Sequence, residues 1–329
     1  MLRTIKFAEA GGPEVLEFVE TAVPAPGPAE VRINVKAIGI NRADSMWRKD
    51  VYMEPVKFPA GLGYEAAGFV DAVGSDVTGL AVGDEVSVIP SFSLNQYFTY
   101  GEVITVPDYA VVKHPKLLSL VQAASVWMMF LTAYGVLIED AEVGKGDFVL
   151  IPAASSSVGL AAIQIANYAG ATSIALTRTS AKAKQLLDAG AAHVIVTDEV
   201  DLVEQVMHIT DGKGARVAFD AVGGPNFPKL VSALAVQGTV YIYGALAEGE
   251  TPLPVMAMIA KTPVIKGYNI WLTVGDETRR KAAVDYVLKG LQSGALKPVI
   301  DSTFAFDEMV KVHHYLESNS QFGKIVVTV

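Results

Sequence analysis

The stretch FVLIPAASSSVG, residues 148–159, begins with four apolar residues of strand length and continues through a turn of small residues. Apolar residues with helical spacing follow over residues 158–169. A dinucleotide-binding fold needs such a strand, turn and helix, because backbone N–H groups must approach a pyrophosphate at the positive end of a helix. The stretch therefore predicts a phosphate-binding loop.

This loop departs from the G-x-G-x-x-G pattern. It fits A-x-x-G-x-x-G spacing, in which Ala153 comes first, Ser156 replaces the middle glycine and Gly159 comes last. Serine keeps the turn small and adds a hydroxyl that can bond phosphate. An ordinary serine-rich turn is the alternative, and the regular pattern that follows argues against it. The predicted cofactor-binding residues here are Ala154, Ser155, Ser156, Ser157, Val158 and Gly159.

The end of the next strand favours NADPH over NADH. Residues 177–182 read TRTSAK and contain no acidic residue to bond a ribose 2′-hydroxyl, whereas Arg178 and Lys182 suit a 2′-phosphate. The alternative is a solvated helix start capped by Thr179 or Ser180. Cations oppose the helix dipole there, so the cofactor interpretation is preferred. The predicted ligands are Thr177, Arg178, Ser180 and Lys182.

Apolar strands alternate with amphipathic helices beyond the loop, which predicts a doubly wound parallel sheet over residues 123–265. The expected strands are 173–177, 193–196, 215–219 and 239–243, and the expected helices are 181–189, 202–209 and 227–235. Residues 1–122 are rich in glycine and proline, and residues 31–38 alternate apolar and polar side chains. They predict a β-rich, partly open barrel. We expect residues 266–329, with a closing strand at 324–329, to return to that barrel. The fold class is therefore α/β.

Composition excludes several classes of protein. The chain has 329 residues, of which 51% are hydrophobic and 19% charged, so general disorder is excluded. A net charge of -9 argues against nucleic-acid partners and against docking on an anionic membrane. The start lacks an apolar signal region, and the apolar stretch 126–138 is shorter than a membrane span, so we expect a cytoplasmic protein. Because cysteine is absent, disulfides, a thiolate nucleophile and cysteine-containing zinc sites are excluded.

Residues 63–77, GYEAAGFVDAVGSDV, resemble the GHE-x-x-G-x(5)-G-x-x-V signature of the medium-chain dehydrogenase/reductase superfamily. Further matches lie at 39–44, 131–134, 220–224, 243–245 and 322–324. The chain is similar to the zinc-independent quinone oxidoreductases of that superfamily. The resemblance implies a GroES-like catalytic domain at 1–122 and 266–329, a Rossmann domain at 123–265, and an active site in the cleft between them.

The resemblance also bears on the metal. Zinc alcohol dehydrogenases of the superfamily carry a cysteine at or near the position of Asn41 and a histidine at Tyr64. Their third ligand, a cysteine, is missing here, and the five histidines lack ligand spacing, so no metal site is predicted. Without Lewis-acid help, hydride transfer to conjugated acceptors is favoured. The predicted activity is NADPH-dependent quinone reduction. The alternatives are 2-alkenal or enone C=C reduction and non-enzymatic NADPH binding.

Residue roles follow from the same resemblance. Asn41 would contact the nicotinamide ribose or the substrate, although a simple turn residue is equally consistent with its position. Tyr52 would donate to the substrate carbonyl, and Tyr64 would either donate or fill the former metal space. Met46 stands where relatives have a tyrosine, with Trp47 as a neighbouring aromatic wall. The predicted substrate pocket consists of Met46, Trp47, Tyr52 and Trp271.

The remaining cofactor contacts are also carried over from the family. They are Thr132, Val222, Gly244, Ala245, Phe322, Gly323 and Lys324, together with Asn41. An exposed strand-edge lysine is the alternative for Lys324. The resemblance further implies a homodimer, in which the strand at 239–243 or its neighbour pairs across a two-fold axis and the apolar stretch 252–259 covers the seam.

Overall fold

The computed structural model describes residues 2–22 and 25–329, and the chain divides into two compact units. The first unit comprises Met1–Met128 and Lys297–Val329, and the second comprises Met129–Leu296. Both boundaries lie later in the sequence than the expected 122/123 and 265/266.

The later second boundary has a packing cause. The helices α9 (Trp271–Val274) and α10 (Glu277–Ser293) belong to the second unit. Tyr286 on α10 packs against Tyr134 and Tyr168, with ring centroids 5.0 and 5.3 Å away. Aromatic contacts of this kind bury large areas and hold α10 on the nucleotide-type unit, so the chain returns to the first unit only after α10.

The second unit contains the predicted doubly wound sheet. Its six parallel strands lie in the order β11-β10-β9-β12-β13-β14. They are β9 (Phe148–Ile151), β10 (Thr172–Thr177), β11 (His193–Val196), β12 (Ala215–Asp220), β13 (Leu234–Ile242) and β14 (Val264–Gly267). The strand order reverses between β9 and β12, and ligands of such sheets bind outside the carboxyl ends at that point. The phosphate-type loop follows β9 directly.

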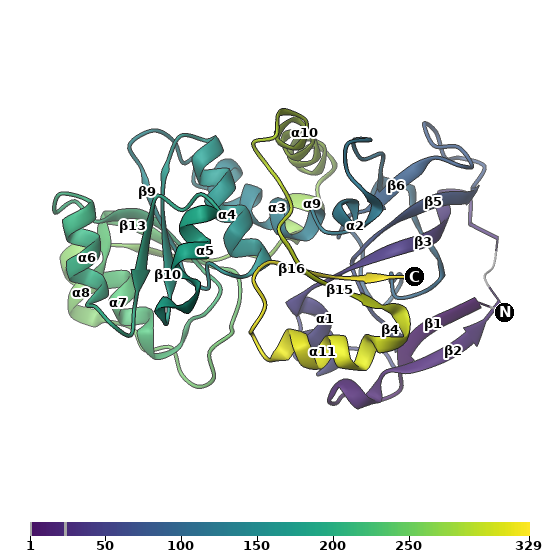
Figure 1. Cartoon of the computed structure of the whole chain (residues 1–329), viewed down its shortest axis with the longest axis horizontal. Coiled ribbons are helices and arrows are strands. Elements are labelled where there is room, and N and C mark those ends of the chain that lie inside the picture. The colour runs from purple at the N-terminus through teal and green to yellow at the C-terminus, as the bar shows by residue number, and fades with distance from the viewer. Residues whose placement is uncertain (1, 23–24) are drawn as a thin grey trace. The chain divides into compact units, whose positions relative to one another are not determined.

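Helices connect these strands, as the alternation predicts (Figure 1). They are α4 (Ser157–Tyr168), α5 (Ala183–Asp188), α6 (Leu202–Ile209), α7 (Phe227–Ser232) and α8 (Val255–Lys261). Their apolar faces and the strands form one buried core that includes Leu150, Ile174, Val206 and Val231. The helix expected at 227–235 ends at Ser232, because the following residues already pair as β13 with β12.

The first unit is β-rich, and the C-terminal tail completes it. One sheet has the order β15-β16-β3-β5-β6-β8 with β7 paired to β3, and a smaller one has the order β2-β1-β4. The strands are β1 (Leu2–Phe7), β2 (Glu17–Thr21), β3 (Glu30–Ile40), β4 (Ala60–Gly61), β5 (Glu65–Val73), β6 (Glu85–Val88), β7 (Val103–Pro107), β8 (Val111–Val112), β15 (Ile300–Ala305) and β16 (Lys324–Thr328). Figure 1 shows β16, drawn in yellow, beside β3, and Ile325 pairs with Ile40.

The first unit also contains short helices. They are α1 (Arg42–Arg48), which follows β3 directly, α2 (Leu120–Ala123) and α11 (Met309–Glu317) in the tail. Three-residue 3-10 turns lie at Pro13–Val15, Asp108–Ala110 and Phe306–Glu308 in this unit, and at Ser180–Lys182 and Gly224–Asn226 in the other.

One helical segment is longer than the sequence suggested. The segment Leu120–Asp140 continues through α3 (Trp127–Tyr134) and a π-helical turn at Gly135–Asp140, and its 21 residues have a mean hydropathy of 1.6 over the most apolar window. By length and composition alone this helix could cross a membrane, which the shorter apolar stretch 126–138 considered by itself did not indicate. However, 83% of that window is buried inside the protein, which is typical of a core helix.

Candidate active site

Asn41 stands at the junction of β3 and α1 in the first unit, and its amide is held at both ends. Its Nδ2 donates to Glu65 Oε2 at 2.9 Å and to the carbonyl of Gly39 at 3.2 Å, while its Oδ1 accepts from Lys324 Nζ at 2.6 Å. Its backbone N–H donates to Asp44 Oδ2 at 2.8 Å. Asn41 is therefore far more constrained than a simple turn residue.

Lys324 and Glu65 form a fully buried ion pair, since both side chains have an exposure of 0%. Glu65 also accepts from the backbone N–H of Met128 at 2.7 Å. The alternative that Lys324 is an exposed strand-edge residue is wrong, because pairing of β16 with β3 carries it into the interior. With its ammonium group bonded to Asn41 and Glu65, Lys324 orients Asn41. The predicted contact of Lys324 with the cofactor stays a prediction.

The two predicted catalytic tyrosines lie side by side, with ring centroids 6.2 Å apart. Burial raises the pKa of Tyr52 to about 12 and raises the pKa of Tyr64 further, so both phenols keep their protons near neutral pH. The two hydroxyls influence each other's pKa. Among the residues that the structure describes, however, the Tyr64 hydroxyl makes no hydrogen bond of ordinary geometry. Tyr64 is 1% exposed and Tyr52 is half-buried, so Tyr52 is the more accessible of the two side chains.

Trp47 does not line a substrate pocket, so that prediction is wrong. Its side chain is 0% exposed, and its indole N–H donates to the carbonyl of Gly61 at 3.0 Å. Successive residues on a helix point about 100° apart, so the neighbouring Met46 on α1 faces elsewhere and is half-buried. Trp271 is also half-buried, on α9 of the second unit. Met46, Tyr52 and Trp271 remain predicted pocket residues.

The loop after β9 has the close packing that a pyrophosphate site requires. A Cβ added at Gly159 would lie 2.7 Å from Ala153 O and Ala154 Cα, so only glycine lets α4 start this close to the loop. Ser156 caps α4 by accepting from the Gly159 N–H at 3.0 Å. The N–H groups of Ser157 and Val158, which precede Gly159 in the first turn, have no acceptor earlier in the helix. The side chain of Ala154 is buried, so that residue can contribute only backbone groups.

The cationic end of β10 also suits NADPH. Arg178 is exposed, and its side chain has no hydrogen-bond or ion-pair partner within residues 2–22 and 25–329. Lys182 Nζ lies 3.4 Å from Ser155 Oγ and so connects the two halves of the expected phosphate site. Thr179 occupies the capping position without making a capping hydrogen bond, which weakens the alternative of an ordinary capped helix start. These groups fit a pyrophosphate and a 2′-phosphate.

Comparisons with known proteins identify the family of this chain. Residues 27–116 match the family model described as an alcohol dehydrogenase GroES-like domain, and residues 157–287 match the one described as a zinc-binding dehydrogenase. Quinone oxidoreductase 1 of Escherichia coli K12 is 33% identical over 331 residues, covering 98% of both chains. The chain belongs to the quinone oxidoreductase family of the medium-chain dehydrogenase/reductase superfamily.

Solved structures of this family and superfamily have the same fold. The structure of Escherichia coli quinone oxidoreductase complexed with NADPH has a TM-score of 0.89 and 30% identity, covering 99% of this chain and 100% of that one. An NAD-dependent alcohol dehydrogenase has the same TM-score with 32% identity and covers 99% of both chains. The resemblance and the fold class are confirmed, whereas the roles of individual residues remain predictions.

The remaining predicted cofactor-binding residues of this quinone oxidoreductase family member lie in both units. Gly244 follows β13, and a Cβ there would lie 2.8 Å from Ala221 O, so glycine permits a close approach. The N–H of Val222 donates to Asp220, and Thr132 on α3 is 7% exposed. In the other unit, the N–H of Phe322 donates to Asp301 at 2.8 Å. Ala245 is exposed, and Gly323 has a φ of +110°.

Sequence reasoning missed several polar residues of the site. Glu65 lies inside the quoted family signature but was given no role, and Asp44 stands at the capping-box distance from Asn41. Both signals were present in the sequence. Tyr100 and His313 also join this network, but their separation of 213 residues left no local pattern to find them.

Proposed function

We propose that this protein is an NADPH-dependent quinone oxidoreductase that works without zinc. The observation that carries the proposal is which residues occupy the predicted catalytic positions of the first unit. Where zinc dehydrogenases of the superfamily place ligands, this chain has Asn41 and Tyr64, and a buried Lys324–Glu65 pair orients Asn41. Both N–H donors of the Asn41 amide are engaged by Glu65 and Gly39, so the tyrosine hydroxyls are the donors that this site would offer to a substrate. Full-length similarity to quinone oxidoreductases supports the same assignment.

NADPH, when bound, supplies the hydride. The loop after β9 and the start of α4 would hold its pyrophosphate, and Arg178 with Lys182 would hold its 2′-phosphate. On the catalytic side, the raised pKa of Tyr52 keeps its hydroxyl protonated, so it can donate to the oxygen on which negative charge develops. Asn41, fixed by Lys324 and Glu65, would orient the reacting ring.

Oxidation of NADPH by chelator-treated protein tests the proposal, with a panel of 1,2-quinones, 1,4-quinones and 2-alkenals as acceptors. We expect turnover with quinones and no loss of activity after chelation. Turnover with 2-alkenals alone would favour the C=C reductase. Absence of turnover with every acceptor would refute both enzyme assignments, and loss of activity on chelation would refute the zinc-free mechanism.

We also propose that the protein forms a homodimer through the β14 edge of the six-stranded sheet. Strongly exposed apolar residues lie on β13, on β14, on α8 and just before α8. They are Val236 (68% exposed), Leu253 (56%), Val255 (63%), Met256 (75%), Ile259 (66%) and Val264 (51%). A second copy pairing along β14 would cover both the edge and this apolar surface. Light scattering at micromolar concentration tests this proposal, and a monomer mass would refute it.

A cytoplasmic location remains a proposal as well. Fractionation of cells that express the tagged protein would test it, and recovery in the membrane fraction would contradict it.

A further inference from the structure

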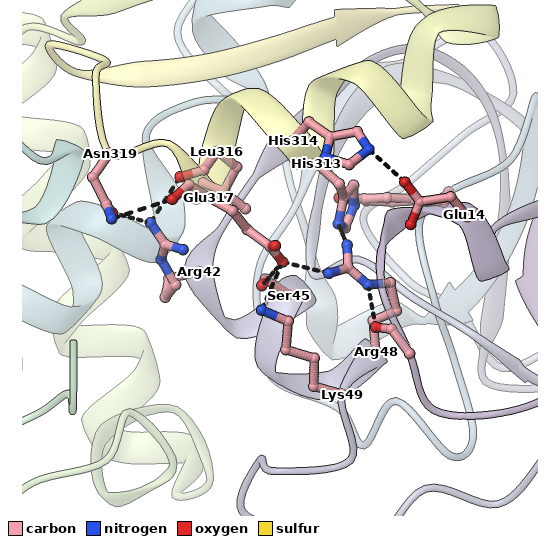
Figure 2. Close-up of polar contacts among 12 residues, drawn as sticks. Glu14, Arg42, Ser45, Arg48, Lys49, His313, His314, Leu316, Glu317 and Asn319 are labelled. Atoms are coloured by element: carbon pink, nitrogen blue, oxygen red, sulfur yellow. Dashed lines mark hydrogen bonds and ion pairs between the residues drawn. The ribbon is translucent and has the colours of Figure 1, made fainter. Parts of the chain in front are cut away.

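A buried guanidinium ties the C-terminal helix to the helix that carries the site. The side chain of Arg48 on α1 is 0% exposed. Its Nε donates to the carbonyl of Gly11 at 3.0 Å, its Nη1 lies 2.6 Å from His313 Nδ1, and its Nη2 pairs with Glu317 (Figure 2). Glu317 also accepts from Ser45 and pairs with Lys49. The charge of Arg48 is therefore fully satisfied within the protein.

This arrangement fixes the protonation of His313. Arginine has only donors and stays charged, so His313 Nδ1 must accept. Burial and the neighbouring Arg48 lower the pKa of His313 to about 3, so the ring is neutral and carries its proton on Nε2. That N–H faces Tyr100 Oη at 3.3 Å, and the Tyr100 hydroxyl donates to Asp44 Oδ2 at 3.1 Å. The hydrogen bonds thus run in one direction, from Arg48 to Asp44.

Asp44 receives the end of this chain and holds the site residue Asn41. Its Oδ2 accepts from Tyr100 and from the backbone N–H of Asn41, while Oδ1 is buried with no hydrogen-bond partner in the described part of the chain. The pKa of Asp44 is raised to about 7, mainly by burial. The hydrogen bond from Asn41, the charge of Lys324 and the hydrogen bond from Tyr100 oppose this rise, and the charge of Glu65 adds to it. The phenols of Tyr52 and Tyr64 lie close enough for their pKa values to respond to its charge.

We propose that His313 and Tyr100 are positioning residues for quinone reduction, which act through ionised Asp44 to hold Asn41 in its productive orientation. The inference rests on the proposed function. Protonation of Asp44 would place a proton on Oδ1, which lacks an acceptor, and would weaken the bond from the Asn41 N–H. Arg48 enforces the opposite state, because it fixes the tautomer that lets Tyr100 donate toward the carboxylate.

The experiment compares wild type with Tyr100→Phe, His313→Phe and His313→Gln. Loss of the Tyr100 hydroxyl removes a hydrogen bond that lowers the pKa of Asp44, so its titration should move up by about one unit. The acid limb of kcat/KM for a 1,4-benzoquinone should move with it. At pH 6 this lowers kcat/KM roughly tenfold, and at pH 9 the activity should approach that of wild type. His313→Phe should lower kcat/KM in the same direction.

The glutamine variant separates positioning from packing. Its amide can accept from Arg48 and donate to Tyr100, so His313→Gln should recover kcat/KM to within about threefold of wild type. The dissociation constant for NADPH should stay within about twofold in all variants, because the predicted NADPH ligands of the second unit are untouched. Unmoved acid limbs in Tyr100→Phe and His313→Phe, or a glutamine variant as impaired as His313→Phe, would overturn the proposal.

A measurement without turnover keeps the two proposals distinguishable. The 13C signal of the Asp44 carboxyl should titrate in wild type and shift its midpoint upward in Tyr100→Phe. An equal midpoint in both proteins would overturn the proposed action of Tyr100 on Asp44, even if quinone reduction proceeds. A wild-type protein that reduces no quinone would refute the proposed function. The carboxyl titration could then still show that Tyr100 influences Asp44, but this influence would have no role in quinone reduction.

Discussion

Replacing Lys324 with methionine should remove a large part of the stability of the first unit. Glu65 would keep its hydrogen bonds from Asn41 and Met128 but lose the only cation paired with it among the residues that the structure describes. Both partners are 0% exposed, so solvent cannot replace the lost ammonium group. Breaking a buried pair in this way costs about 3–5 kcal/mol. Typical domains unfold with only about 5–15 kcal/mol, so the loss is a large fraction of the total.

Urea unfolding followed by tryptophan fluorescence measures this loss. In a Trp271→Phe background, the remaining reporters Trp47 and Trp127 both lie in the first unit, which avoids mixing the two unfolding transitions. Lys311→Met is the matched control, because Lys311 pairs with Glu308 at 2.9 Å but is 69% exposed. It should cost less than about 1 kcal/mol.

A double variant tests the cause. Adding Glu65→Gln to Lys324→Met removes the unpaired charge while keeping an acceptor for the Met128 N–H. It should therefore recover most of the lost free energy of unfolding. If Lys324→Met costs no more than Lys311→Met, or if the two changes at the buried pair are simply additive, the reasoning about an uncompensated buried charge is refuted.

Three further predictions concern the cofactor, pH and assembly. Arg178→Ala should raise the KM for NADPH at least tenfold and leave the KM for NADH nearly unchanged. The control Lys184→Ala, at an exposed site on α5, should alter neither KM. Equal effects on the two cofactors would contradict a 2′-phosphate role for Arg178. Because the pKa of His313 is lower in the folded protein than the unfolded value of about 6.5, protonation of the unfolded chain lowers the free energy of unfolding as pH falls from 6.5 toward 3. Between pH 6.5 and 5.5 the wild type should lose about 1 kcal/mol through this histidine, and His313→Gln should not lose it in urea unfolding. An equal pH dependence of the free energy of unfolding in the two proteins would contradict this. Met256→Glu should convert the dimer to a monomer by light scattering, and an unchanged mass would exclude its side chain from the interface.

The nucleotide-type unit was predictable because its signals are local. The strand at 148–151, the small-residue turn and the helix spacing after it lie within about twenty residues, and the structure has the βα alternation that they predict. The end of β10 likewise carries the cations that the sequence placed there.

Predictions failed where long-range packing decided the outcome. Trp47 was expected beside a substrate, but α1 turns it toward Gly61, and no spacing rule reveals which helix face becomes interior. The domain boundary shifted to 296/297 because Tyr286 finds its aromatic partners in the second unit.

The sequence by itself determined the fold class, the family, the phosphate-type loop and the absence of cysteine ligands, because each depends on residue identity and short-range spacing. Only the tertiary structure decided how the catalytic half is held together. Lys324 reaches Glu65 and Asn41 across 259 and 283 residues. A charged side chain becomes a buried orienting group only when distant strands pair and exclude water, and a linear sequence does not reveal which ones will.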